Sequence, residues 1–420
     1  MSSEKIAAFL KERRGNLLLR RASPLLTLLV LAIPSTPGLE ATTPRPLDSA
    51  PLAFKVRRDP GLDRIFRRGK GWIGGDAADS VPLGKGRVLW LFGDSLLGRV
   101  QGGRRVIDTM VRNTIAIQQG LNPRSARVTF YHGTVGGRPD AMFRPVAGKG
   151  WFWPCQGGIR TRAGLYIFLL RIVDVPEDPG AMGFRTEGMV LAKISNPDAD
   201  PSQWIIHQYT VPYYLRDQLG NERSFGIPQQ RKGAWVYLSG LDYDPRGGNR
   251  YLLAARTRSE RLEDFTSWEF RSGGGWSKDF RKAERLCDHV GAELSVTALP
   301  GSDRHLLVTT ENGLSDRIVL RTSPTPWGPW SPTVPLYRAP EPRKNRSILC
   351  YAAKAHPELT RRDDELVVSY VCNTTDLGRL SEKPGLYMPE FLSVRFRKQA
   401  PPERFHLPAR SAVLALKPTS

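Results

Sequence analysis

The stretch that decides the fold is Trp72-Ile-Gly-Gly-Asp76-Ala-Ala-Asp79-Ser-Val-Pro-Leu-Gly-Lys-Gly-Arg-Val-Leu-Trp-Leu-Phe-Gly-Asp94-Ser95-Leu96. Two runs of strand-forming residues flank Gly84-Lys85-Gly86, and glycines at such positions are typical of a tight β-hairpin turn. If these three residues form the loop, Leu83 faces Arg87 and Asp76 lies directly opposite Asp94. The sequence therefore predicts two aspartates on one face of one hairpin.

In this register Asp76 and Asp94 have the chemistry of an acid/base pair. Directly opposed side chains have Cβ atoms roughly 5 Å apart, so two carboxylates there raise one pKa and leave the other low. A register slip of one residue would place the two side chains on opposite faces. The alternative for both residues is a local bond to backbone at a turn or strand end.

The N-terminal residues 1–41 are predicted to be a targeting segment. Basic residues precede the apolar run 25–33, and small residues follow it, as in a secretory signal peptide. Nine apolar residues are too few for a permanent membrane span, although an uncleaved anchor is the alternative. Two Arg-Arg pairs raise twin-arginine export without a good consensus around them. We expect a secreted, periplasmic or cell-envelope protein that contacts membranes only through this segment.

The charge of the chain points to anionic partners outside the nucleic acids. Formal net charge is +21, and removal of residues 1–41, with six basic and three acidic side chains, leaves about +18. The arginines are spread along the chain, with no long basic block and no repeated aromatic-basic signature of a DNA or RNA binder. We expect a monomer whose partner is a polysaccharide, an anionic one being compatible with the charge, while solvated surface charge is the alternative.

The four cysteines are Cys155, Cys287, Cys350 and Cys372. In an exported chain they allow two disulfides and three pairings, among which we prefer Cys350 with Cys372 on adjacent strands. No Cys-x-x-Cys spacing or other ligand cluster indicates a metal, and no cofactor is implied.

Short β-rich runs separated by turn residues dominate the rest of the chain and indicate an all-β protein. They are residues 88–92, 113–118, 164–170, 189–194, 234–239, 251–255, 306–310, 318–321, 365–371 and 391–396. They group into five units of about 55 to 65 residues, several of which end in a tryptophan. The repeat predicts a five-bladed β-propeller, with a decorated β-sandwich as the alternative.

We therefore predict one propeller domain at residues 66–400, after the segment 1–41 and a Pro-rich tether at 42–65, and followed by a tail at 401–420. The first strand of every blade lines the channel of a propeller. The polar residues of those strands are expected to face one funnel, and they are Asp76, Gln156, Gln229, Glu293 and His356.

Three motifs resemble a secreted bacterial family of unknown function that includes endo-D-arabinanases. They are Gly-Gly-Asp76-Ala-Ala-Asp79-Ser-Val-Pro-Leu, Leu-Trp-Leu-Phe-Gly-Asp94-Ser and Asn113-Thr-Ile-Ala-Ile-Gln118. The blade endings around Trp268 and Trp330 resemble the wider set of five-bladed propeller glycosidases. The resemblance covers about residues 71–398 and implies a glycoside hydrolase, with arabinan-like furanosides as substrate.

By this resemblance the catalytic carboxylates are Asp76 and Asp94, one as acid and the other as nucleophile or base, with their separation setting the stereochemistry. Glu293 is a third candidate, as the acid or as a modulator of a partner's pKa; its alternative is a strand residue paired with an arginine. Substrate-binding candidates are Trp72, Asp79, Trp153, Gln156 and His356. The alternatives are packing for the tryptophans, including Trp151, and a satisfied structural role for the histidine.

Two other function classes compete with hydrolysis of glycosides. Gly93-Asp94-Ser95-Leu96 matches the signature of esterases that use the serine as nucleophile, but no histidine follows an aspartate by three residues and no α/β pattern is visible. A non-catalytic, glycan-binding propeller of the cell envelope is the second alternative, because the fold does not fix the function.

Overall fold

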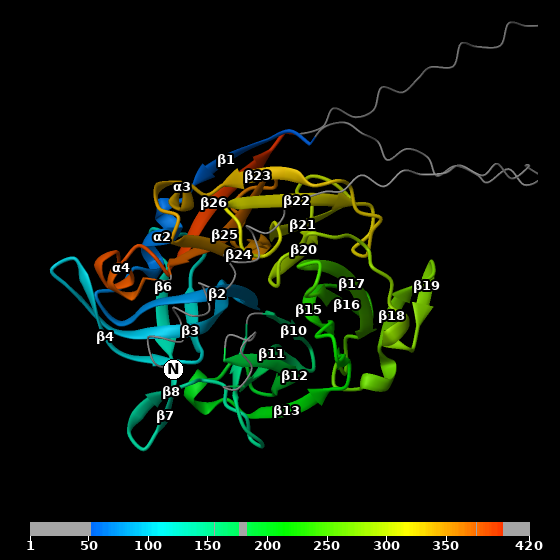
Figure 1. The fold of residues 1–420 in the computed structure, drawn as a ribbon, viewed down its shortest axis with the longest axis horizontal. Coiled ribbons are helices and arrows are strands. Elements are labelled where there is room, and N and C mark those ends of the chain that lie inside the picture. Colours follow the sequence, from blue (N-terminus) through cyan, green and yellow to red (C-terminus); the bar gives the residue numbers. More distant parts are fainter. Residues whose placement is uncertain (1–51, 155, 176–182, 375, 398–420) are drawn as a thin grey trace, which may run out of the picture.

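Five antiparallel sheets form a ring, as predicted, and the protein is a five-bladed β-propeller (Figure 1). The computed structural model describes residues 52–154, 156–175, 183–374 and 376–397. The predicted segment 1–41 and the predicted tail 401–420 lie outside these residues. All ten predicted β-rich runs overlap strands of the five blades, and two of them, 113–118 and 234–239, begin one residue before the strand.

The first three blades follow the chain in order. Blade 1 contains β2 (Lys70–Gly84), β3 (Arg87–Gln101), β5 (Thr114–Gln119) and β6 (Arg127–Tyr131), with β4 (Arg104–Val111) paired to the far half of β3. Blade 2 contains β10 (Gly158–Thr161), β11 (Gly164–Asp174), β12 (Phe184–Ile194), β13 (Ile206–Val211) and β9 (Trp151–Trp153). Blade 3 contains β14 (Tyr214–Arg216), β15 (Glu222–Lys232), β16 (Trp235–Asp244), β17 (Asn249–Arg258), β18 (Glu269–Ser272) and β19 (Gly275–Ser277).

The last two blades complete the ring. Blade 4 contains β20 (Leu294–Ala298), β21 (His305–Thr310), β22 (Arg317–Ser323) and β23 (Val334–Arg338). Blade 5 contains β24 (Ile348–His356), β25 (Glu365–Thr374), β26 (Pro389–Phe396) and β1 (Phe54–Arg58). The connections hold the hairpin β7 (Gly133–Val135) and β8 (Arg138–Asp140), the helices α2 (Pro60–Phe66), α3 (Glu341–Lys344) and α4 (Leu377–Glu382), and the 3-10 turns η1 (Pro201–Gln203), η2 (Phe265–Ser267), η3 (Phe280–Lys282) and η4 (Pro357–Leu359).

The inner strands surround the centre of the ring. β2 contacts β10, and the contacts continue through β15, β20 and β24 back to β2. Apolar side chains fill the spaces between blades; Leu89 and Leu91 of β3, for example, pack with Ile167 and Leu169 of β11. Because each blade buries a face against both neighbours, side chains of the inner strands are held in fixed positions around the centre.

The ring closes through β1, which corrects the predicted tether at residues 42–65. Phe54 pairs with Phe396 and Val56 with Val394, so the first strand of the chain becomes the outer strand of the last blade. The helix α2 follows directly and packs on β26. Apolar Phe54 and Val56 alternate with charged residues, which gives this strand one inward face despite its Pro-rich surroundings.

The opening hairpin keeps the predicted pairing through a different turn. Gly84 pairs with Arg87, so the loop has two residues, Lys85 (φ 52°) and Gly86 (φ 69°), as in a type I′ turn. A bulge between Pro82 and Gly84 then restores the expected register, in which Val81 faces Leu89 and Gly75 faces Ser95. Asp76 and Asp94 occupy the short irregular stretch next to the Gly75 and Ser95 pair, so they are not the directly opposed partners that the sequence predicted.

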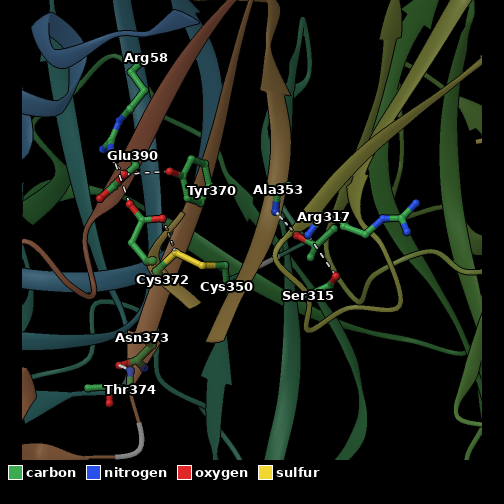
Figure 2. The surroundings of a disulfide bond; sticks show 12 residues. Arg58, Ser315, Arg317, Cys350, Ala353, Tyr370, Cys372, Asn373, Thr374 and Glu390 are labelled. Carbon is green, nitrogen blue, oxygen red and sulfur yellow. Dashed lines mark hydrogen bonds and ion pairs between the residues drawn. A yellow bond between two sulfur atoms is a disulfide. The ribbon is translucent and has the colours of Figure 1, made fainter. Parts of the chain in front are cut away.

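A disulfide joins Cys350 of β24 to Cys372 of β25, as we preferred from the sequence (Figure 2). The two residues are direct cross-strand partners and are buried. Beside them Tyr370 donates to Glu390 at 2.9 Å, and Arg58 of β1 forms an ion pair with the same carboxylate. Cys287 is not in a disulfide, and Cys155 lies outside the described residues.

Within the described ranges, no helix has the length and apolar character needed to cross a membrane.

Candidate functional site

Two inner strands, β2 and β24, each interrupt their regular alternation at an Ala-Ala pair. The segments are Asp76-Ala-Ala-Asp79 and Tyr351-Ala-Ala-Lys354. Residues three apart point to opposite faces of a regular strand. Here Ala77 (φ 64°), Ala78 (φ 55°) and Ala352 (φ 59°) adopt the left-handed region and the register shifts. As a result Tyr351 of one segment meets Asp76 of the other, and Lys354 meets Asp79.

Asp76 is the carboxyl group with the most perturbed environment. The hydroxyl of Tyr351 donates to its Oδ2 at 2.9 Å. Burial raises the pKa of Asp76 to about 8, with further contributions from the negative charges of Asp94 and Glu293. At neutral pH this carboxyl therefore carries a proton, which is the state that a general acid requires.

Asp94 has a different set of partners. The indole N–H of Trp153 donates to its Oδ1 at 3.0 Å, and the Arg112 guanidinium lies 3.5 Å from its Oδ2. Burial raises the pKa of Asp94, while Arg112 and Trp153 oppose that rise by stabilising the charged form. Its backbone carbonyl accepts from the Tyr387 hydroxyl at 2.7 Å. Asp94 thus has a cationic partner and an N–H donor that favour its charged form against the effect of burial.

The buried ammonium group of Lys354 contacts two further carboxylates, those of Asp79 and Glu293, next to Asp76 and Asp94. Lys354 is 2% exposed; its Nζ donates to Asp79 at 2.9 Å and to the Ala77 carbonyl at 2.8 Å, and it forms an ion pair with Glu293. Burial alone would lower the pKa of Lys354, but Asp79 and Glu293 raise it above its ordinary value. Burial raises the pKa of Asp79 to about 7 against the opposing charge of Lys354.

Three of the five residues pooled from the inner strands come together, and two do not. Asp76 and Glu293 interact electrostatically, and Gln156 donates to the carbonyl of Ala292, the neighbour of Glu293. Gln229 instead donates to Ser239 within its own blade. His356 is fully buried between Ser80 and Ser369, and burial lowers its pKa to about 3. His356 therefore occupies a position that fits the alternative given above, a structural histidine with both ring nitrogens hydrogen-bonded.

Trp72 and Trp151 also occupy packing positions. Trp72 is 2% exposed and stacks on Phe130, with ring centroids 4.5 Å apart. A tryptophan enclosed in this way offers no face to a sugar ring, so the predicted stacking role does not fit its position. Trp151 is buried under the Arg112 guanidinium. Trp153 remains half-buried, with its indole nitrogen committed to Asp94.

Ser95 is unsuited to nucleophilic attack, which argues against the esterase alternative. Its side chain is fully buried, and its hydroxyl donates to the Gly93 carbonyl at 2.9 Å and bonds Thr114. An esterase nucleophile must reach the substrate and be activated by a base. The serine of this Gly-Asp-Ser-Leu sequence bonds the backbone beside Asp94 and holds this irregular part of β3 in place.

Sequence reasoning missed four residues around the pair, namely Arg112, Tyr351, Lys354 and Tyr387. A signal existed for two of them, because Tyr351-Ala-Ala-Lys354 repeats the spacing of Asp76-Ala-Ala-Asp79. Tyr387 (φ 56°) lies just before β26, where no strand pattern marks it. In the described part of the chain, the one cluster of candidate metal ligands is Glu341 with Cys350 and Cys372, whose sulfurs form the disulfide.

Comparisons with known proteins agree with this fold. No curated protein matches the chain. A candidate hydrolase from Bacteroides ovatus ATCC 8483 is 18% identical, with a TM-score of 0.63 over 85% of this chain and 97% of that one. A protein of unknown function from Dyadobacter fermentans (10% identity, TM-score 0.42, 79% and 97% covered) and the GH62 α-L-arabinofuranosidase of Coprinopsis cinerea (12% identity, TM-score 0.41, 78% and 92% covered) are more distant.

The family model named DUF5005, a domain of unknown function, matches residues 59–397, which include all five blades except β1. A match over most of the chain identifies the family. The protein therefore belongs to the DUF5005 family.

Proposed function

We propose that the protein is a glycoside hydrolase that cleaves a cell-wall or environmental polysaccharide, with Asp76 as general acid and Asp94 as nucleophile or base. The observation that carries this proposal is the contrast between the two carboxyls. The pKa of Asp76 is raised to about 8, so it is protonated at neutral pH, while Asp94 has Arg112 and Trp153 as partners that favour its charged form. Glycosidases need one carboxylic acid to protonate the leaving oxygen and one carboxylate to act as nucleophile or base at the anomeric carbon.

In this mechanism Asp76 donates its proton to the glycosidic oxygen as the bond to the anomeric carbon breaks. The Asp94 carboxylate either attacks that carbon to form a glycosyl ester, which water then hydrolyses with Asp76 as the base, or removes a proton from a water molecule that attacks the carbon directly. Glu293 acts as the modulator, because its negative charge contributes to the raised pKa of Asp76. Lys354 holds Glu293 and Asp79 in place below the pair.

We favour arabinan-like furanosides as substrate, on the strength of the sequence resemblance described above. Trp153 and Gln156 are the candidates for sugar contacts at the rim of the pair, with Asp79 deeper on the same strand as Asp76. The disulfide is typical of an oxidising compartment, which supports action outside the cytoplasm.

The test is a screen of the mature chain against cell-wall glycans, including D-arabinan and acidic polymers, with reducing ends as the readout. Asp76→Asn and Asp94→Asn are compared with Asp108→Asn, an exposed aspartate of β4. We expect release by the parent and by Asp108→Asn, and a loss of roughly 10²-fold or more in the other two variants.

Glycan binding without release, unchanged in Asp76→Asn and Asp94→Asn, would overturn the hydrolase and leave a binding propeller. Anomers of the first product, followed by NMR, would then assign retention or inversion and so the part played by Asp94.

A further inference from the structure

A cleft of about 480 Å³ lies on the outside of blade 1, away from the central carboxylates. It opens between α2 and the start of β6, which are in contact at the edge of the ring (Figure 1). β6 is the outermost strand of its sheet, and β3 and β5 separate it from β2 with Asp76. The cleft is therefore distinct from the site described above.

Four arginines line this cleft, and no carboxylate does. They are Arg64, Arg67, Arg68 and Arg127, around the apolar side chains of Ile65, Pro123, Ala126 and Val128. Elsewhere on the surface arginines meet acids, as Arg160 meets Asp198 at 2.6 Å. Among the residues that the structure places, none of the four cleft arginines has a carboxylate within ion-pair distance. Four like charges around one hollow repel one another, and no ion pair relieves that repulsion among the described residues.

The acids nearest in sequence are committed elsewhere. Asp63 of α2 is 3% exposed, accepts from the backbone N–H of Phe391 at 2.9 Å and lies 4.0 Å from Arg58. Asp59 caps α2 and forms an ion pair with Arg361. Asp63 interacts electrostatically with Arg67, but neither carboxylate forms an ion pair with a cleft arginine.

Arg68 is held in a fixed position at the inner wall. Its guanidinium donates to the Val128 carbonyl and lies over the Phe130 ring, 5.7 Å from the centroid. Its Nε is buried and has no partner among the described residues. Because this Nε is enclosed, a ligand from outside would meet the exposed arginines of the cleft, Arg64, Arg67 and Arg127. The apolar floor strengthens any charge pairing by excluding water.

We propose that this cleft binds an acidic polysaccharide through the carboxylate or other oxyanion groups on its sugars. Guanidinium groups bind such groups through paired N–H donors, and the volume is that of an ordinary ligand site. A concave cleft fits a polymer chain better than a flat membrane surface, and its wall lacks the exposed aromatic stack that single-stranded nucleic acid requires. This binding site goes beyond the proposed hydrolysis and does not depend on it.

The test measures binding of polygalacturonate, with neutral arabinan as the uncharged comparison, to the full mature chain at low and moderate salt. The variant Arg67→Gln/Arg127→Gln changes two exposed cleft residues. Its control, Arg138→Gln/Arg185→Gln, removes the same charge from exposed positions on β8 and β12. We expect the cleft variant to bind at least about tenfold more weakly and the control to change less than about twofold.

Equal losses in the two variants would overturn the proposal, because net charge alone would then explain the affinity. Equally tight binding of duplex DNA or of anionic phosphatidylglycerol vesicles, lost in the same cleft variant, would reassign the cleft to another class of partner. Glycan release from the central site is recorded in parallel, so that failure of the hydrolase and failure of the cleft are separate results.

Discussion

The hydroxyl of Tyr351 donates to the carboxyl of Asp76 at 2.9 Å, although 275 residues separate them in the chain. One rung below, Lys354 donates to Asp79 at 2.9 Å across the same sequence distance. Blade 5 thus provides the partners of both Asp76 and Asp79 of blade 1. The site is therefore complete only when the last blade packs against the first.

Replacing Tyr351 by Phe should move the protonation of Asp76. Burial and Asp94 raise the pKa of Asp76, and the Tyr351 hydrogen bond partly opposes them by stabilising the charged form. Its removal should shift the alkaline limb of the pH–activity profile upward by roughly one pH unit. Tyr131→Phe, which loses a bond to Asp200 on the outside of blade 1, is the control. An unmoved limb in Tyr351→Phe would remove Asp76 from the role of acid.

The protonated state of Asp76 should also appear in the pH dependence of stability. Its folded pKa of about 8 lies above the ordinary value of 3.8, so between these pH values the folded chain binds a proton that the unfolded chain has lost. Stability from this group is complete below about pH 4 and is lost as pH rises through 8. Asp76→Asn removes that loss.

The measurement is the melting temperature of Asp76→Asn relative to the parent across this pH range. We expect a small difference near pH 4 and an advantage of several degrees for Asp76→Asn near pH 8. The exposed Asp108→Asn should show a constant difference throughout. A gap that stays flat in Asp76→Asn would mean that this carboxyl is ionised in the folded protein.

Lys354→Met should destabilise the propeller by about 3 to 5 kcal/mol, because it leaves Asp79 and Glu293 buried without their shared cation. Lowering the pH should reduce the loss, since protonation neutralises the carboxyls. The triple variant Lys354→Met/Asp79→Asn/Glu293→Gln should recover most of it in denaturant unfolding. Lys149→Met, on an exposed loop, serves as control. Failure of the triple variant to recover would mean that packing, rather than charge, dominates at Lys354.

The disulfide should contribute about 3 kcal/mol to unfolding free energy, as expected for a loop closed by residues 22 positions apart. Cys350→Ala/Cys372→Ala tests this in urea, with and without reductant. The parent should lose stability on reduction, and the variant should not respond. A parent that is insensitive to reductant while its thiols react would contradict the expected contribution.

Truncation should reveal how much β1 contributes to closure. A chain that starts at residue 53 keeps the pairs of Phe54 and Val56 with β26, whereas a chain that starts at residue 59 exposes that edge of blade 5. Two half-buried apolar side chains contribute about 1 kcal/mol each, and the ladder of backbone bonds adds to them. We expect a lower unfolding midpoint and more aggregation in the shorter chain. Equal midpoints would assign closure to other contacts.

The sequence predicted the blades because alternation and turn glycines are local signals, and it placed Asp76 and Asp94 near each other because one hairpin carries both. It could not locate Tyr351 or Lys354 at the site, since their contacts depend on how blade 5 meets blade 1. The role of the two Ala-Ala pairs could not be predicted either, because alanine rarely adopts the left-handed region. The left-handed conformations of Ala77, Ala78 and Ala352 bring residues three apart to one face. Trp72 was assigned to the substrate because a half-buried and a fully buried tryptophan look alike in a sequence.

Because Phe54 pairs with Phe396, the last blade can form only after β26 has been synthesised. Among the strands that the structure describes, β1 is synthesised first and its partner β26 last. During synthesis β1 stays without its partner until nearly the whole domain has been made, so this pairing is a contact of very high sequence separation. A prematurely ended chain keeps two open strand edges and an unassembled Asp76 environment, which exposes it to proteases before it can act.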